Sequence, residues 1–450
     1  MAKSEYLTAP IPSKKMPSGM PYILGNEAAE RFAFYGMTSI LVIFMTKYLT
    51  GADGKLAVMG DEQAKTWFHL FNSGVYFLPF VGALIADIWL AKYRTVIYFC
   101  LVYCVGLFAL TFDHTRVGLG VGLVLAAIGS GVVKPCVSAN VGDQFGKTNE
   151  HLLSKFYAWF YFSINLGACI SMFLCPWLLD RYGPFLGFGV PGGLMVVATL
   201  AYWLGRRKFV HIPAGGLGFV RETLSGEGLR AVAKLVIIYL FVIMFWALFY
   251  QSQSAWVLQA EHMNLRWLGF TWLPEQPQAI NPFLIMVMIP LFSYVVYPAI
   301  DRVFPLTALR KIAIGLFLAA LSFVVSAWIE TQIVAGAKPS IGWQGFAYVI
   351  LTAAEIMVSI TCLEFSYTQA PKRMKSFIQA IFLMSISAGN TFTAVVNWII
   401  ENEDGTRKLP GASYYWFFVI AMLATALLFI PVARRYKLQD YIQDEAVTET

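Results

Sequence analysis

Charged residues are scarce in this sequence. Only 13% of its 450 residues are Asp, Glu, Lys or Arg, whereas 58% are hydrophobic. A soluble globular protein carries about 25% charged residues, so this composition argues against a soluble domain. The clustered arginines that a nucleic-acid surface would need are also missing. We therefore expect a lipid bilayer, and no nucleic acid, among the partners of the chain.

Motifs for phosphate, zinc and acyl-transfer chemistry are missing as well. The sequence has no G-x-x-x-x-G-K-[ST] loop for ATP, no H-E-x-x-H zinc motif and no G-x-S-x-G elbow. We expect neither an enzyme nor a bound cofactor. The six cysteines fall in or beside apolar runs, which predicts small buried side chains rather than disulfides or zinc ligands. Nothing near the N-terminus looks like a removable signal peptide.

Long apolar runs are the main positive feature of the sequence. A stretch of 18 or more apolar residues predicts a membrane-spanning helix, and such stretches recur along the whole chain. They predict an all-α integral membrane protein with twelve transmembrane helices. The runs cover about 22–49, 66–90, 95–112, 117–141, 155–179, 185–206, 232–258, 280–302, 308–330, 341–369, 374–400 and 412–434.

Basic residues predict the orientation of these helices. About two thirds of the 33 Lys and Arg residues lie in the two tails and in the loops after runs 2, 4, 6, 8 and 10. The positive-inside rule then places both termini in the cytoplasm. Since no targeting signal is evident, we expect a bacterial inner membrane. We also expect the protein to be a monomer.

A glycine-rich, basic segment divides the chain into two halves. We expect a six-helix bundle over 1–206 with a cytoplasmic tail over 1–21, a cytoplasmic linker over 207–231, and a second bundle with a short tail over 232–450. Two six-helix halves are the plan of the major facilitator transporters. A twelve-helix channel or membrane enzyme would share the helix count.

Three charged residues lie close together in the first run. Glu27, Glu30 and Arg31 share one helical face with Tyr35, because they are spaced at i, i+3, i+4 and i+8. Each charge at membrane depth costs roughly 2.5–3.5 kcal/mol even on a lenient insertion scale. This face must therefore look at a partner or a water-filled cavity rather than at lipid.

Other polar side chains lie at similar depth: His69, Tyr76, Lys134, Asn165, Asn281 and Glu355. An imidazole in a cavity can relay protons, although a lone histidine is as often a packing residue. Lys134 could instead reach toward the cytoplasmic end. The first half thus supplies cations and the second half an isolated carboxylate, a layout that suits a zwitterion. Titratable groups favour protons as the driving ion, while a sodium site made of backbone carbonyls would leave no trace in the sequence.

The chain resembles a known family, the proton-coupled oligopeptide transporters of the major facilitator superfamily. The likeness covers nearly the whole chain. The motifs that carry it are Glu27-x-x-Glu30-Arg31-Phe32, Gly82-Ala83-Leu84-Ile85-Ala86-Asp87 with Lys92 and Arg94, Phe160-Tyr161-x-x-Ile164-Asn165-x-Gly167, Phe245-Trp246-Ala247-Leu248, and Glu364-Phe365-Ser366-Tyr367-Thr368-Gln369-Ala370-Pro371.

The resemblance implies a proton-coupled symporter of di- and tripeptides and gives roles to individual residues. Arg31 and Lys134, with Tyr35 nearby, would hold the carboxylate of the peptide. The amino terminus of the peptide would be held by Asn165, Asn281 and Glu355. Tyr76 would also contact the substrate, and Phe382 would line a side-chain pocket.

The resemblance also implies how protons and gates work. Glu27 and Glu30 would couple proton binding to the release of Arg31. His69 and Tyr76 resemble a pair of the animal-like members, in which the histidine is tied to proton coupling. A cytoplasmic latch between helix ends would consist of Asp87, Lys92 and Arg94.

The sequence departs from the family pattern at three positions. Tyr250 stands where the family usually has an acidic residue, Phe34 replaces a tyrosine, and Ala91 replaces a glycine in what looks like a mild change. Two alternatives to peptide symport therefore stay open. One is the same fold carrying amino acids, nitrate or another small anion. The other is a nutrient sensor or an uncoupled facilitator.

Overall fold

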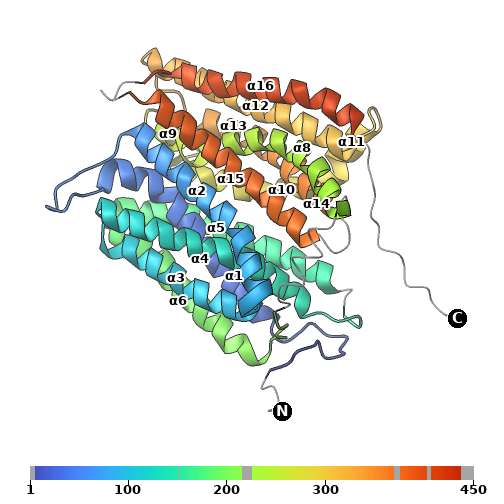
Figure 1. Ribbon diagram of the computed structural model, residues 1–450. Helices are drawn as coiled ribbons and strands as arrows, with labels where there is room; N and C mark the ends of the chain where they lie inside the picture. Colours follow the sequence, from blue (N-terminus) through green and yellow to red (C-terminus); the bar gives the residue numbers. More distant parts are fainter. Residues whose placement is uncertain (1–5, 150–151, 215–225, 369–374, 403–406, 437–450) are drawn as a thin grey trace.

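The computed structural model describes residues 6–149, 152–214, 226–368, 375–402 and 407–436 (Figure 1). Residues 215–225 of the expected linker lie outside the described residues. So do the side chains of Asp87 and Glu364.

Six long helices form the first half of the chain. Their backbone polar groups are paired within each helix, as hydrocarbon surroundings require. They are α1 (Met20–Ile43), α2 (Asp61–Ile85), α3 (Lys92–Phe112), α4 (Arg116–Asp143), α5 (Leu153–Tyr182) and α6 (Pro184–Leu204). Single π-helical turns extend α1 over Phe44–Tyr48 and α2 over Ala86–Leu90.

The second half contains more interruptions within its helices. Its helices are α8 (Gly226–Phe249), α9 (Ala255–Ala260), α10 (Ile280–Leu291), α11 (Tyr297–Asp301), α12 (Ala308–Val334), α13 (Gly342–Glu355), α14 (Thr361–Thr368), α15 (Lys375–Ile400) and α16 (Ala412–Arg435). Short 3₁₀ and π turns join several of them, at Tyr250–Gln253, Gln276–Ala279, Phe292–Val296 and Ile356–Ile360. A short β hairpin consists of two strands of two residues each, β1 (Arg266–Trp267) and β2 (Phe270–Thr271). It pairs Arg266 with Thr271.

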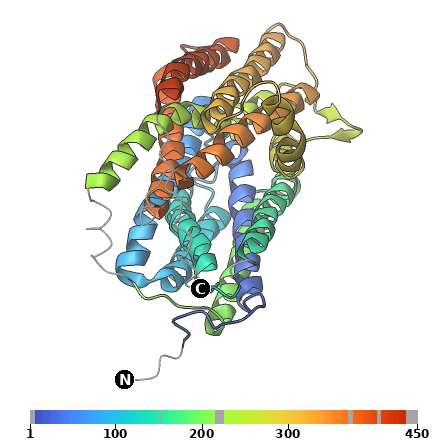
Figure 2. The same cartoon turned by 90° about the vertical axis from the view of Figure 1, so that its right-hand side faces the viewer.

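The helices separate into two bundles that follow the sequence order. In Figures 1 and 2, α1 to α6 lie in one layer and α8 to α16 in the other. Figure 2 shows the β hairpin projecting at one side. Each bundle has its own apolar core, one built almost wholly from residues before 210 and the other from residues after 234. Twelve helical segments in the described ranges are long and apolar enough to cross a membrane, which confirms the expected number.

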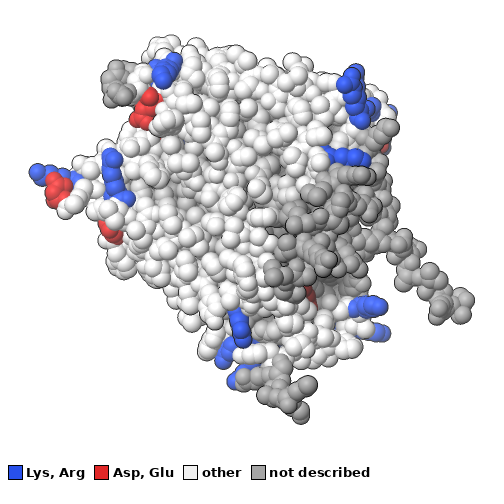
Figure 3. Space-filling model, in the orientation of Figure 1, with Lys and Arg blue, Asp and Glu red and all other residues white. Residues whose placement is uncertain are grey.

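On the face shown in Figure 3, exposed charged side chains lie at the two ends of the molecule. Figure 3 shows a broad face without them, and Lys, Arg, Asp and Glu gather at either end of the helices. Large apolar residues such as Val121, Val124 and Leu427 are exposed on the helix surfaces. This belt matches the hydrocarbon layer of a bilayer and identifies an integral membrane protein.

Two local features differ from the sequence expectations. Helix α2 begins at Asp61 rather than at 66, because charged side chains of its first turns form ion pairs. Ala91, between α2 and α3, has φ 61° and ψ 153°. This backbone region is essentially reserved for glycine, so the change from glycine stores strain rather than being mild.

Close packing inside the first bundle depends on glycine. A Cβ placed on Gly129 of α4 would lie 2.4 Å from the Cβ of Tyr103 on α3. The two backbones therefore approach more closely than any larger residue would allow, which is common where membrane helices cross. The contact fixes α4, and with it Lys134, relative to the rest of the bundle.

Candidate functional site

The charged cluster of the first run forms a compact ion-pair network on α1. The Arg31 Nε lies 2.6 Å from the Glu27 Oε1 and 3.3 Å from the Glu30 Oε2. Ser130 on α4 donates a hydrogen bond of 2.8 Å to the Glu30 Oε1. Glu27 and Glu30 are each 1% exposed, so solvent does not screen the network. The α1 face predicted from the spacing thus points into the bundle, toward α4.

Lys134 is held by aromatic faces rather than by a carboxylate. Its ammonium lies 3.6 Å from the ring centroid of Phe34 and 4.8 Å from that of Tyr76. Among the described residues, its Nζ has no hydrogen-bond partner. Cation–π contacts stabilise the charge but leave its donors free. Lys134 is therefore poised to bind an anion.

A cavity of about 220 Å³ lies between the two bundles. Five of the expected substrate residues line it: Tyr35, Tyr76, Asn165, Asn281 and Glu355. Arg31 and Lys134 do not reach its wall, and the rings of Tyr35 and Tyr76 stand there instead. The cations thus lie one side chain behind the cavity surface in this conformation.

The opposite wall presents a single carboxylate from the second bundle. The Asn281 amide donates to the Glu355 Oε2 at 2.7 Å and to the Thr352 hydroxyl at 3.0 Å. Among the described residues, no Lys or Arg forms an ion pair with Glu355. A carboxylate that has an amide partner but no cation can receive an ammonium group from a ligand.

Aromatic residues near the end of α8 and in the 3₁₀ turn after it complete this part of the cavity. Tyr250 lines it and packs against Tyr76, with ring centroids 5.6 Å apart. Trp246 also lines it. Phe382 is 1% exposed and packs behind Trp246, so the expected aromatic wall is Trp246 rather than Phe382. Phe382 supports Trp246 from the side that faces away from the cavity.

His69 lies in the contact between the two bundles rather than in the cavity. Its Nδ1 is 2.8 Å from the Asn390 Oδ1, and its Nε2 is 3.0 Å from the Ser254 hydroxyl. Since Asn390 uses its amide nitrogen for the Ile386 carbonyl, its oxygen is the acceptor of the His69 Nδ1–H. A neutral imidazole then accepts from Ser254 at Nε2. His69 therefore bridges both bundles through hydrogen bonds.

The expected cytoplasmic latch is placed only in part. Lys92 Nζ lies 2.7 Å from the Asp143 Oδ2, which joins the start of α3 to the end of α4. Arg94 is exposed. The side chain of Asp87 lies outside the described residues.

Sequence reasoning missed several partners of the predicted residues. Ser130 had a weak signal, since it lies between two glycines only four residues before Lys134. Ser254 and Asn390 had none, because hydroxyl and amide side chains are common in membrane helices. Their pairing with His69 depends on the way in which α2, α15 and the α8–α9 turn meet.

Twelve spanning helices in two bundles around a polar cavity are the arrangement of the major facilitator transporters. The chain matches the model of the POT family over residues 93–221 and 217–417. It therefore belongs to the POT family, which consists of transporters rather than enzymes.

Relatives among curated proteins agree with this assignment. The chain is 35% identical over 373 residues to "Peptide transporter family 1" of Drosophila melanogaster, covering 72% of this chain and 49% of that protein. It is 34% identical over 397 residues to "Solute carrier family 15 member 2" of Homo sapiens, covering 77% of this chain and 53% of that protein. The chain thus spans about half the length of the curated relatives it matches.

Solved structures confirm the fold. An auto-inhibited POT family peptide transporter matches with a TM-score of 0.85 at 30% identity, covering 95% of this chain and 99% of that one. The POT family transporter PepTSo matches with a TM-score of 0.85 at 32% identity, covering 93% and 98%. The major facilitator fold expected from the sequence is therefore correct.

Proposed function

We propose that this chain carries di- and tripeptides across a membrane together with protons, by alternating access between its two bundles. The charge layout around the cavity carries the proposal. Glu355 stands in one wall and forms no ion pair with a described Lys or Arg, while Arg31 and Lys134 gather behind the other wall. A short peptide offers an ammonium group and a carboxylate at its two ends, which match these charges. Membership in the POT family and the names of its relatives support this function.

The size of the cavity supports a small cargo. Pockets for drug-sized ligands enclose roughly 300–1,000 Å³, and the cavity here is about 220 Å³. Its wall combines tyrosine rings with a few polar groups, among them Asn165 and Asn281. Such a wall tolerates varied side chains and still orients the two ends of a peptide.

Protons are the proposed coupling ion, and no cofactor is required. Arg31 is held by Glu27 and Glu30 in the network described above. When either carboxylate takes up a proton, the guanidinium loses part of its attraction and becomes free for the carboxylate of the peptide. Glu30 keeps its bond to Ser130 when it is uncharged, so the cluster retains its geometry. Loss of the proton then returns Arg31 to its acidic partners and weakens the grip on the cargo.

The domain plan, location and orientation are part of the same proposal. Residues 1–206 and 232–450 would move as two bodies, connected by the linker over 207–231. We place the chain as a monomer in a bacterial inner membrane with both termini in the cytoplasm. The distribution of Lys and Arg along the sequence supports this orientation. Peptides, protons and the bilayer are then its partners.

Substitution of Glu30 tests the proposal. In liposomes with an imposed pH gradient, the parent chain should accumulate labelled dialanine, and Glu30→Gln should lose accumulation while it retains counterflow exchange. Asp53→Asn, in the exposed loop before α2, is the matched control and should accumulate normally. Unchanged accumulation in Glu30→Gln would contradict coupling through Glu30.

The parent chain separates the alternative functions in the same assay. Accumulation that no peptide inhibits would favour amino acids or small anions as cargo. Simple equilibration of the label would point to an uncoupled facilitator.

A further inference from the structure

We infer that Arg407 is the outer latch of this chain, a guanidinium on the α15–α16 loop that holds the two bundles together by binding Asp61 and Glu62 at the start of α2. "Outer" denotes the end of the molecule where α1 connects to α2 and α15 to α16. The inference goes beyond the proposed function and rests on it only for the expectation that the two bundles separate at this end.

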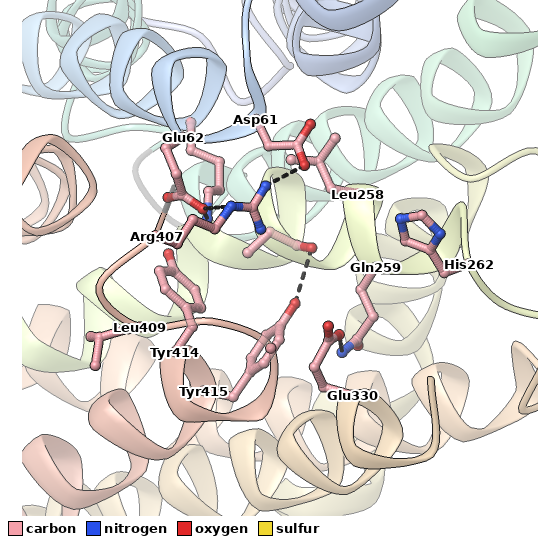
Figure 4. Close-up of a pocket in the computed structure, with 13 residues that line it drawn as sticks. Asp61, Glu62, Leu258, Gln259, His262, Glu330, Arg407, Leu409, Tyr414 and Tyr415 are labelled. Carbon is pink, nitrogen blue, oxygen red and sulfur yellow. Dashed lines mark hydrogen bonds and ion pairs between the residues drawn. The ribbon is translucent and has the colours of Figure 1, made fainter. Parts of the chain in front are cut away.

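The latch connects segments that are far apart in the sequence. The Arg407 Nη2 lies 2.5 Å from the Asp61 Oδ2, and its Nε lies 3.3 Å from the Glu62 Oε1. Figure 4 shows the guanidinium between the two carboxylates, beside a cavity of about 80 Å³. The Arg407 and Asp61 side chains are 39% and 40% exposed, whereas that of Glu62 is 3% exposed. The contact with Glu62 is therefore the less screened of the two.

The charges at the start of α2 are paired in part from the second bundle. Lys65 lies one turn further along α2, with its Nζ 2.7 Å from the Glu62 Oε1 and 3.9 Å from the ring centroid of Tyr414. Asp61, Glu62 and Lys65 together leave one negative charge on α2, and Arg407 neutralises it from the second bundle. When the bundles separate, Glu62 keeps Lys65 as a partner, but the remaining negative charge of these three α2 side chains loses Arg407. The closed state is thus favoured without making opening prohibitive.

Beyond Lys65, whose ammonium faces the Tyr414 ring, the described residues of the same stripe of α2 contact the second bundle through neutral groups. Positions 61, 65, 69 and 73 recur every four residues and face the second bundle. Ser73 hydroxyl is 3.0 Å from that of Ser387 and 2.7 Å from that of Thr391 on α15. Water can replace such bonds at little net cost when the seam opens. The ion pairs of Arg407 at the outer end, which we call the rim, are therefore the contacts between the bundles that water replaces least well.

A second ion pair joins the bundles at this end but is weaker. Lys47, after α1, pairs with Glu261, after α9. The Lys47 side chain is 50% exposed, so water competes for it and the pair contributes little. Arg407 differs because one of its partners is almost fully buried.

Distances between spin labels test the latch without any substrate. Labels at Lys55, in the α1–α2 loop, and Lys338, between α12 and α13, report the separation of the outer ends in the full chain in lipid nanodiscs. We expect Arg407→Gln to increase the ratio of long to short distances roughly five- to tenfold, the scale for losing a partly buried ion pair. Lys408→Gln is the matched control, because Lys408 bonds the Ile399 carbonyl of its own bundle. Equal distributions in both variants, or equal shifts, would overturn the inference.

Cross-linking gives an independent measurement if Arg407→Gln does not fold. In Asp61→Cys/Arg407→Cys, a short bifunctional thiol reagent should join the two bundles. The cross-link should then abolish counterflow exchange of labelled dialanine across the bilayer. Reduction of a cleavable reagent should restore exchange. Undiminished exchange in the cross-linked protein would refute the latch. The spin-label readout requires neither peptide nor proton gradient, so failure of the proposed function would leave it intact.

Discussion

Removal of one buried carboxylate should stabilise this protein in a pH-dependent way. Glu275 lies just before the 3₁₀ turn that leads into α10 and is 5% exposed. Burial raises its pKa to about 7, and Glu261 and Asp180 act in the same direction, while Lys47 opposes them. Glu275 therefore binds a proton more tightly in the folded protein than in the unfolded chain, where its pKa is near 4.5.

The sign and size of the effect follow from this difference. Between pH 4.5 and 7 the folded state holds more protons than the unfolded state, so stability falls as the pH rises through this window. At 1.36 kcal/mol for each pH unit, the ionised Glu275 costs about 3 kcal/mol above pH 7 and almost nothing near pH 4.5. Glu275→Gln should remove this cost.

Thermal unfolding in detergent at two pH values measures this effect. Glu275→Gln should raise the melting midpoint above that of the parent chain at pH 8 and leave it nearly unchanged at pH 5. Asp53→Asn, an exposed carboxylate, should change neither value by a comparable amount. The reasoning fails if Glu275→Gln lowers the midpoint at pH 8, or shifts it equally at both pH values.

Two further substitutions test local features of the structure. Ala91→Gly should stabilise the protein by about 1 kcal/mol, since φ is 61° there, and a higher melting midpoint would show it; no gain would contradict the strain. Tyr250→Glu would place a carboxylate beside Tyr76, near Lys134. It should raise the KM for dialanine at least tenfold while Tyr250→Phe does not, and equal KM values would argue against Lys134 as the carboxylate site.

The parts of the molecule that the sequence predicted are those set by local composition. Twelve apolar runs were enough to give twelve spans, because the hydrocarbon layer fixes both length and polarity. The cluster of Glu27, Glu30 and Arg31 was evident for the same reason, since charges inside an apolar run are costly. The contact between Glu27 and Arg31 followed from their i, i+4 spacing, whereas the contact between Glu30 and Arg31, adjacent in sequence, did not.

Features that depend on pairing between distant segments could not be predicted in this way. Arg407 lies in a polar loop, where a basic residue is ordinary, and its partners are about 350 positions away. Asp61 and Glu62 looked like the end of a loop rather than the first turn of α2. Phe382 was expected in the cavity wall, but its ring packs behind Trp246, which lines the cavity instead.

The distribution of charge separates binding of the cargo from closure of the outer end, although both take place where the two bundles meet. Around the cavity, the bundles meet through neutral groups such as Tyr76 with Tyr250 and His69 with Asn390. The ion pairs that hold Arg31 lie inside one bundle, so a proton can change the grip on cargo without breaking the contact between bundles. At the rim, Arg407 joins the bundles directly. Its strength therefore sets how often the outer side opens, independently of the chemistry that holds the cargo.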